Sequence, residues 1–297
     1  MNKKKLLITG GSGLVGKHLK AIFPEGIYPS RQECDLSDIN RIKDVLKQYT
    51  PDIVIHLAAK VGGIQDNIKK PAEFFDDNIL INTNILKATY EQGIGRFVGI
   101  LTTCMYPDQV DHYPMAESDI FSGPPNAMNF SYAYAKRCLA VQIEAYNKQY
   151  GTQYNYLIPC NLYSEMDNFE EDDKMHFITA LLKKIKDAKG TIPLLGTGKP
   201  LRQFLYAGDL ARVIKEVVNR DITESFNVAP DYNYSINTMA EMALEVLGKE
   251  DKIVYSDPHL DGQYRKDVSA EKMLSLIPDF RFTDFKEGIK RTYDKIS

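Results

Sequence analysis

The segment that decides the fold is Thr9-Gly10-Gly11-Ser12-Gly13-Leu14-Val15-Gly16, near the start of the chain. The apolar run 6–8 precedes it, and an amphipathic stretch over 14–23 follows it. This order predicts a strand, a glycine turn and a helix, which is the context of a dinucleotide-phosphate site. Glycines let the backbone approach a pyrophosphate, and the helix presents free N–H groups and the positive end of its dipole to that anion. The turn alone predicts binding and no reaction.

Short apolar runs alternate with longer amphipathic stretches through the first half of the chain. Strands are predicted at 6–9, 53–57, 97–101 and 154–158, and helices at 14–23, 39–49, 72–91 and 132–150. This alternation favours an α/β fold, a Rossmann doubly wound parallel sheet covered on both faces. From about residue 161 the elements become shorter. We therefore predict a Rossmann domain over 1–160 and a smaller C-terminal substrate-binding α/β domain over 161–297. Within the second range, about 201–222 is predicted to return to the Rossmann domain through a strand at 203–206 and a helix at 210–218.

The bulk composition is that of an ordinary globular protein. The 297 residues carry a formal net charge of −3, so the charge does not favour nucleic acid or an anionic membrane as a partner. No apolar run approaches the roughly 18 residues that span a bilayer. Cys34, Cys104, Cys138 and Cys160 are widely spaced, which predicts reduced thiols and neither a disulfide framework nor a metal site. We expect a cytoplasmic protein.

A tyrosine and a lysine stand four residues apart in the stretch that reads as the helix 132–150. Tyr132 and Lys136 then share one helix face and can meet one substrate. An ammonium group beside a phenol favours the phenolate, so we expect Lys136 to lower the pKa of Tyr132 toward working pH. The competing interpretation is two residues of an exposed helix. Together with the glycine turn and the hydroxyl-bearing strand end Leu101-Thr102-Thr103, the pair predicts nicotinamide chemistry.

With these elements the chain resembles the extended short-chain dehydrogenase/reductases and, within them, the GDP-L-fucose synthase family. The resemblance covers most of the sequence. Its strings are Ala58-Ala59-Lys60-Val61-Gly62-Gly63-Ile64, Cys104-Met105-Tyr106-Pro107, Asn161-Leu162-Tyr163, Asp167-Asn168-Phe169, Arg202-Gln203-Phe204-Leu205, Asp261-Gly262 and Arg265-Lys266. The first two strings distinguish this family from its nucleotide-sugar relatives.

The resemblance implies NADPH-dependent C4 reduction of a GDP-linked 4-keto sugar, in nucleotide-sugar biosynthesis for surface polysaccharide, together with epimerisation at C3 and C5. By the same resemblance Thr102 hydrogen-bonds the C4 oxygen, Tyr132 gives it a proton, and Lys136 holds the nicotinamide ribose. Cys104 and His176 match an acid/base couple for the epimerisation, since hydrogens next to a ketone are acidic enough to exchange. A buried thiol and a structural histidine are the competing interpretation.

The resemblance also implies the residues that bind the cofactor and the substrate. Cofactor contacts are expected at Gly10, Gly13, Leu14, Val15, Gly16, Arg31, Asp35, Leu36, Ala58, Ala59, Lys60, Tyr132 and Lys136. Arg31 stands where an NAD enzyme commonly has an acidic residue, which favours the 2′-phosphate of NADPH. The GDP-sugar is expected at Asn161, Arg202, Asp261, Arg265 and Lys266, so the smaller domain becomes a GDP-sugar-binding domain.

Several strings depart from the family pattern around the sugar and nucleotide pockets. Leu101-Thr102-Thr103 replaces Gly-Ser-Ser, Ser164-Glu165 replaces Gly-Pro, and His259-Leu260 replaces Lys-Pro. The substrate is therefore GDP-4-keto-6-deoxymannose or a GDP-4-keto-heptose, and a C4 reductase without epimerase activity stays open. So do a UDP- or dTDP-sugar 4-epimerase or dehydratase and a nucleotide-sensing module without turnover. By resemblance, we expect a homodimer formed through the helices 72–91 and 132–150.

Overall fold

The computed structural model describes residues 4–170, 175–256 and 261–296. Of the altered strings, His259-Leu260 lies outside the described residues. The central element is a parallel sheet in the order β1-β2-β3-β4-β9. These strands are β1 (Leu6–Thr9), β2 (Ile53–His56), β3 (Arg96–Ile100), β4 (Asn155–Pro159) and β9 (Phe226–Val228). Nearly every residue of these strands is buried, as expected for a sheet covered on both faces. The predicted Rossmann fold class is confirmed.

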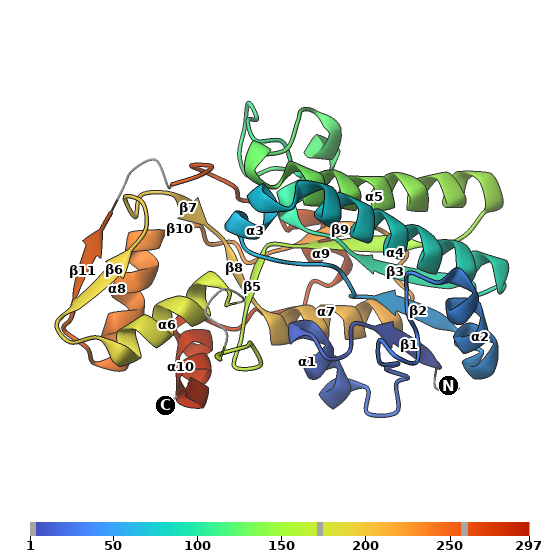
Figure 1. Ribbon diagram of the computed structural model, residues 1–297, viewed down its shortest axis with the longest axis horizontal. Helices are drawn as coiled ribbons and strands as arrows, with labels where there is room; N and C mark the ends of the chain where they lie inside the picture. Colours follow the sequence, from blue (N-terminus) through green and yellow to red (C-terminus); the bar gives the residue numbers. More distant parts are fainter. Residues whose placement is uncertain (1–3, 171–174, 257–260, 297) are drawn as a thin grey trace.

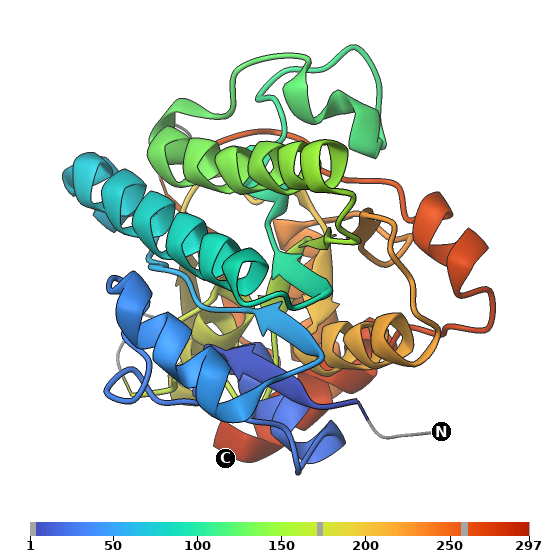
Figure 2. The ribbon, with the colours of Figure 1, turned by 90° about the vertical axis from the view of Figure 1, so that its right-hand side faces the viewer.

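Helices cover the two faces of this sheet (Figure 1). On one face α4 (Pro71–Glu91) packs along α5 (Phe130–Tyr150), and α2 (Ile39–Tyr49) packs against α4. On the other face α1 (Leu14–Ile22) packs against α7 (Ala207–Asn219). Figure 2 shows the α4–α5 layer and α7 on opposite sides of the strands. The predicted helix at 210–218 lies within α7, whose apolar side chains belong to the core of the large sheet.

A second group of elements has its own apolar core, at the left of Figure 1. It comprises α6 (Phe177–Asp187), α8 (Ile236–Leu247), α10 (Phe285–Ile296) and three two-stranded sheets. The sheets pair β5 (Asn161–Tyr163) with β8 (Phe204–Tyr206), β6 (Thr191–Leu194) with β11 (Lys252–Tyr255), and β7 (Leu201–Arg202) with β10 (Tyr234–Ser235). The short helices α3 (Ile64–Lys69) and α9 (Glu271–Leu276) and the 3₁₀ turns η1 (Thr103–Met105), η2 (Glu117–Phe121) and η3 (Ala127–Asn129) complete the fold.

The strand at 203–206 differs from the expectation. It was expected to return to the large sheet, but β8 pairs with β5 instead. Side chains alternate across a strand, and here Leu205 packs in the first core while Phe204 and Tyr206 pack in the second. β8 therefore lies at the junction of the two cores, and the fifth strand of the large sheet is β9, which we did not predict. Our division of the chain into two domains stays a prediction. No described helix is long and apolar enough to cross a membrane.

Candidate active site

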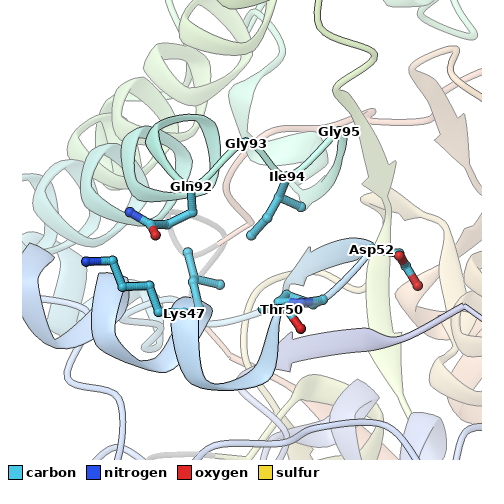
Figure 3. A pocket seen from close by; sticks show the side chains of 9 residues that line it. Lys47, Thr50, Asp52, Gln92, Gly93, Ile94 and Gly95 are labelled. Carbon is cyan, nitrogen blue, oxygen red and sulfur yellow. The ribbon is translucent and has the colours of Figure 1, made fainter.

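The functional side chains expected from the sequence gather at one edge of the large sheet. The glycine turn follows β1, the segment 58–60 follows β2, the segment 102–104 follows β3, and Asn161 follows β4. Carboxyl ends of parallel strands meet at the same edge, which is where open α/β sheets bind ligands. A cavity at the opposite edge, shown in Figure 3, is lined by residues such as Thr50, Asp52 and Gln92 that precede β2 and β3. It contains none of the predicted site residues.

The glycine turn leaves no room for side chains. A Cβ added to Gly10, whose φ is +73°, would lie 2.8 Å from the backbone nitrogen of Ala58. A Cβ added to Gly16 would lie 2.5 Å from the carbonyl oxygen of Gly10. Gly13 caps α1 without any side-chain hydrogen bond, so the N–H groups of its first turn, which holds Leu14 and Val15, have no side-chain cap. The turn therefore fits a pyrophosphate.

The residues expected around the adenosine ribose lie in an exposed loop. Arg31 is exposed, and its charge helps to lower the pKa of Asp35, although hydrogen bonds from the backbone and hydroxyl of Ser37 contribute more. The carbonyl of Leu36 accepts a hydrogen bond from the Asn84 amide at 3.1 Å. Arg31 is thus available to a 2′-phosphate.

The segment after β2 is fixed through its backbone. The Ala58 N–H donates to the Thr9 hydroxyl at 3.4 Å, and the Lys60 N–H donates to Asn78 at 3.0 Å. The ammonium of Lys60 pairs with Glu73 at 3.0 Å and Asp77 at 2.6 Å, both on α4. The charge of Lys60 is therefore neutralised by carboxylates of α4. The small side chains at 58 and 59 permit close approach of a ligand.

Tyr132 and Lys136 lie on α5, which confirms the predicted helix. Lys136 is only 2% exposed, and its ammonium donates to the Ile100 carbonyl at 2.9 Å and lies 5.8 Å from the Tyr132 ring centroid. Burial lowers the pKa of Lys136 to about 8. Burial also raises the pKa of Tyr132, and the Cys104 thiol adds to this effect.

The expected lowering of the Tyr132 pKa by Lys136 is therefore wrong in this structure. Removal of the phenol from water disfavours the phenolate, and the Lys136 ammonium donates its hydrogen bond to the Ile100 carbonyl and not to the phenol. At neutral pH Tyr132 is a neutral phenol. That form is a proton donor, which suits a ketone reduction.

The turn after β3 presents a hydroxyl and a thiol. The Thr102 hydroxyl oxygen accepts a hydrogen bond from the Cys104 N–H at 3.2 Å. Its single hydroxyl hydrogen can face the Cys104 sulfur or turn to a ligand oxygen. The Cys104 sulfur lies 3.2 Å from the Lys266 ammonium. Burial disfavours the thiolate of Cys104, but the Lys266 charge and hydrogen bonds from Thr102, Lys266 and Asn129 outweigh it, so the pKa of Cys104 is lowered.

His176 is held by a carboxylate that the sequence alone did not assign to it. The Nδ1 of His176 lies 3.0 Å from both carboxylate oxygens of Asp167, and the Thr179 hydroxyl donates to Asp167 at 2.6 Å. The Asp167 side chain is 5% exposed, whereas that of His176 is 44% exposed. This bond fixes the proton on Nδ1, so Nε2 is the atom that can exchange protons. Within the described ranges no hydrogen bond joins His176 to Cys104.

Two of the expected substrate residues brace the second group of elements. The Asn161 amide donates to the Gln203 carbonyl at 3.1 Å. The Arg202 guanidinium donates to the carbonyls of Leu201 at 2.8 Å and Asp261 at 3.3 Å, and burial lowers its pKa. The acceptors in these bonds are backbone carbonyls. None of these bonds therefore pairs the positive charge of Arg202 with a carboxylate.

Two others are paired within the protein. The Asp261 carboxylate accepts hydrogen bonds from the Thr197 N–H at 2.6 Å and hydroxyl at 2.7 Å. Arg265 forms a bidentate pair with Asp267 at 2.6 and 2.9 Å and lies 4.8 Å from the Tyr113 ring centroid. Asp261 therefore shapes a loop, and Arg265 is positioned by a buried carboxylate.

Sequence reasoning missed three contacts of the site: Asp167 with His176, and Lys266 and Asn129 with Cys104. Asp167 stands in a string that we quoted, but nothing in the sequence indicates that its carboxylate reaches a histidine nine residues away. Asn129, in η3, has a buried side-chain oxygen without a partner in the described part of the chain. Asn129 directly precedes α5, and it belongs to none of the sequence motifs quoted above.

Comparisons with known proteins show the family to which this chain is similar. A family model described as NAD dependent epimerase/dehydratase family matches residues 6–229. A GDP-L-fucose synthase of Dictyostelium discoideum is 36% identical over 98% of this chain and 94% of its own length. A GDP-L-colitose synthase of Yersinia pseudotuberculosis is 33% identical over 97% and 96%. A solved GDP-L-fucose synthetase of Naegleria fowleri with bound NADP is 32% identical, with a TM-score of 0.88 over 100% of this chain and 93% of that one.

Proposed function

Because the chain belongs to the NAD dependent epimerase/dehydratase family, within its GDP-L-fucose synthase group, we propose that it reduces the C4 ketone of a GDP-linked 4-keto sugar with NADPH. The observation that carries this proposal is the placement of Tyr132, Lys136 and Thr102 at the edge of the sheet that also holds the glycine turn. The chain is thus an NADPH-dependent oxidoreductase of nucleotide-sugar biosynthesis.

The residues present fit NADPH. The glycine turn and the uncapped first turn of α1 accept the pyrophosphate, and exposed Arg31 accepts the 2′-phosphate. Lys136, with one of its three N–H donors on Ile100, retains donors for the hydroxyls of the nicotinamide ribose. Bound NADPH supplies the hydride for C4. The chain itself positions the ketone and moves the proton.

The proton transfer follows from the state of the phenol. Thr102 donates its hydroxyl hydrogen to the C4 oxygen and orients the ketone. Tyr132, a neutral phenol, delivers a proton to the same oxygen as negative charge develops there. The charge of Lys136 then stabilises the phenolate that remains, and the phenolate recovers its proton from water. Burial of Tyr132 and Lys136 strengthens these interactions, because fewer water molecules screen them.

We also propose exchange at C3 and C5 before the reduction. The Cys104 thiolate removes the proton from a carbon next to the ketone, and the electron pair moves to the C4 oxygen to give an enolate. His176, whose Nδ1–H is held by Asp167, takes up a second proton from water at Nε2 and returns it to carbon, and Cys104 loses its proton to water before the next cycle. A reductase without this exchange is the second candidate, because no hydrogen bond joins the two groups in the described residues and the strings around them depart from the family pattern.

The substrate that we propose is GDP-4-keto-6-deoxymannose or a GDP-4-keto-heptose, for a surface or capsule polysaccharide. Arg202 and Arg265 suit the pyrophosphate of GDP, since a guanidinium binds two oxygens at once. Asn161, Asp261 and Lys266 complete the expected substrate residues. The two curated relatives named above make different GDP-sugars, GDP-L-fucose and GDP-L-colitose, so the family accommodates more than one sugar.

We further propose a homodimer formed through α4 and α5. Apolar side chains on these helices are exposed, namely Phe75, Leu80, Phe130, Val141 and Tyr150. Burying them against a second copy would remove apolar surface from water. A cytoplasmic location is proposed as well, and the four free cysteines fit a reducing compartment.

Turnover in deuterated water tests the proposed function. Each candidate sugar is incubated with NADPH, and cofactor absorbance and product mass are read together. Oxidation of NADPH together with deuterium at C3 and C5 of the product supports reduction with epimerisation. Oxidation of NADPH without deuterium in the product supports the plain reductase. No oxidation with either GDP-sugar would overturn the substrate assignment and favour a UDP- or dTDP-sugar enzyme or a sensing module.

Tyr132→Phe tests the proton donor in the same assay. Loss of a general acid lowers kcat by about 10²–10⁴-fold. Tyr134→Phe is the matched control, because Tyr134 lies on the same helix and is 39% exposed. Equal rates for the two variants would contradict the assignment of Tyr132.

A further inference from the structure

Lys266 makes a contact that its expected role does not explain. The family resemblance assigns it to the GDP-sugar, but its ammonium lies 3.2 Å from the sulfur of Cys104, a residue 162 positions earlier in the chain. Both side chains are partly buried. An ammonium at hydrogen-bond distance from a sulfur donates to it and favours the negative form of that sulfur.

The other described groups that act on Cys104 are few. Arg202 adds positive charge, as its electrostatic interaction with Cys104 indicates, and Tyr132 is a neutral phenol. Thr102 and Asn129 contribute hydrogen bonds and no charge. Lys266 is therefore the cation that touches the sulfur directly.

Among the described residues, no ammonium contacts the sulfur of any of the other three cysteines. Burial raises the pKa of Cys34 to about 11, and it raises those of Cys138 and Cys160 as well. Cys160 also feels the charge of Lys266, but burial outweighs that charge there. Direct contact with the ammonium thus distinguishes Cys104 from the other thiols of this chain.

We propose that Lys266 is a positioning residue that holds Cys104 as a thiolate ready to act as the base at C3 and C5. The role of the thiolate as a base rests on the proposed function. The ionisation of Cys104 by Lys266 does not. In the step itself the C–H bond breaks, an S–H bond forms, and the electron pair moves to the ketone oxygen. Lys266 keeps its proton throughout and shifts its hydrogen bond toward the growing negative charge.

The test measures the reactivity of Cys104 without any sugar. Wild type, Lys266→Gln, Lys266→Arg and the surface control Lys199→Gln are alkylated with iodoacetamide between pH 5 and 9, and each cysteine is followed by peptide mass spectrometry. At pH 7 we expect the rate at Cys104 to fall at least about tenfold in Lys266→Gln, because a rise of one unit in a thiol pKa lowers the thiolate population about tenfold. We expect Lys266→Arg to restore most of the rate and Lys199→Gln to leave it unchanged.

Cys138 provides an internal standard, since it is exposed and the same rate is expected there in every variant. An unchanged Cys104 profile in Lys266→Gln, with Cys138 also unchanged, would overturn the proposal. If Lys266→Gln does not fold, wild type and Cys104→Ser are compared by thiolate absorbance during a pH titration. A difference with its midpoint below the ordinary thiol value of about 8.5 supports the proposal, and a midpoint at or above it overturns the proposal.

Activity separates this inference from the proposed function. If Cys104 is reactive but neither GDP-sugar supports NADPH oxidation, the proposed function is overturned. The role of Lys266 in the ionisation of Cys104 then stays intact. If a GDP-sugar supports normal NADPH oxidation but Cys104 is unreactive, the role of Lys266 is overturned and the proposed function is supported. In an active enzyme, deuterium incorporation at C3 and C5 should fall in Lys266→Gln and recover in Lys266→Arg.

Discussion

Replacing Gly16 by alanine should disturb the glycine turn more than the small size of the change suggests. The new Cβ would lie 2.5 Å from the Gly10 carbonyl oxygen and 2.6 Å from the Gly11 Cα. Both are backbone atoms, so no side chain can rotate away. The turn and the start of α1 must separate until these contacts reach about 3.4 Å, an ordinary van der Waals distance.

Two terms set the magnitude for the protein without cofactor. Overpacking costs about 1–3 kcal/mol, whereas alanine inside a helix gains about 0.5–1 kcal/mol over glycine. We therefore expect a net loss of about 0–2.5 kcal/mol in the free energy of unfolding. NADPH binding should suffer more, because a hydrogen bond to a charged group contributes about 1.5–3 kcal/mol and the displaced turn loses at least one. That corresponds to an increase of about tenfold or more in Kd.

The control is Gly95→Ala, at a residue where an added Cβ meets nothing within 4 Å and where φ is not positive. Calorimetric titration with NADPH and thermal unfolding are measured on both variants and on wild type. We expect Gly95→Ala to match wild type in both. An NADPH Kd for Gly16→Ala within twofold of wild type would refute the reasoning, since the turn would then tolerate the Cβ or make no contact with the cofactor.

Three further changes have expected outcomes. Burial lowers the pKa of Lys136 to about 8, so its charge is lost as pH rises through that value, and kcat for C4 reduction should fall above pH 8; a pH–kcat profile that stays level to pH 9.5 would argue against this role. Asp167→Asn removes the carboxylate that fixes the His176 tautomer, so deuterium incorporation at C3 and C5 should drop at least about tenfold while NADPH Kd stays unchanged; equal exchange in both proteins would show that His176 does not need Asp167. Phe285→Ala empties a 2% exposed position in the second core and should cost about 3–5 kcal/mol in denaturant unfolding, and a loss below 1 kcal/mol would mean that this core is loosely packed.

Local patterns in the sequence were enough to predict the large sheet and its first helices. Strands β1 to β4 are short apolar runs, and α5 carries Tyr132 and Lys136 one turn apart. Such features depend on residues close in the chain. The short strand β9 escaped prediction because three residues carry too little periodicity, and β8 was misplaced because its two faces belong to different cores.

The sequence by itself determined the glycine turn, the parallel order of strand and helix, and the identity of the phenol, ammonium and hydroxyl groups at one edge of the sheet. Only the tertiary structure decided how those groups ionise and which partners they meet. It raised the pKa of Tyr132, paired Asp167 with His176, and brought Lys266 to Cys104 across 162 residues. The reason is physical: backbone conformation follows from neighbours in the chain, whereas burial and electrostatic contact depend on segments that meet only when both cores have packed.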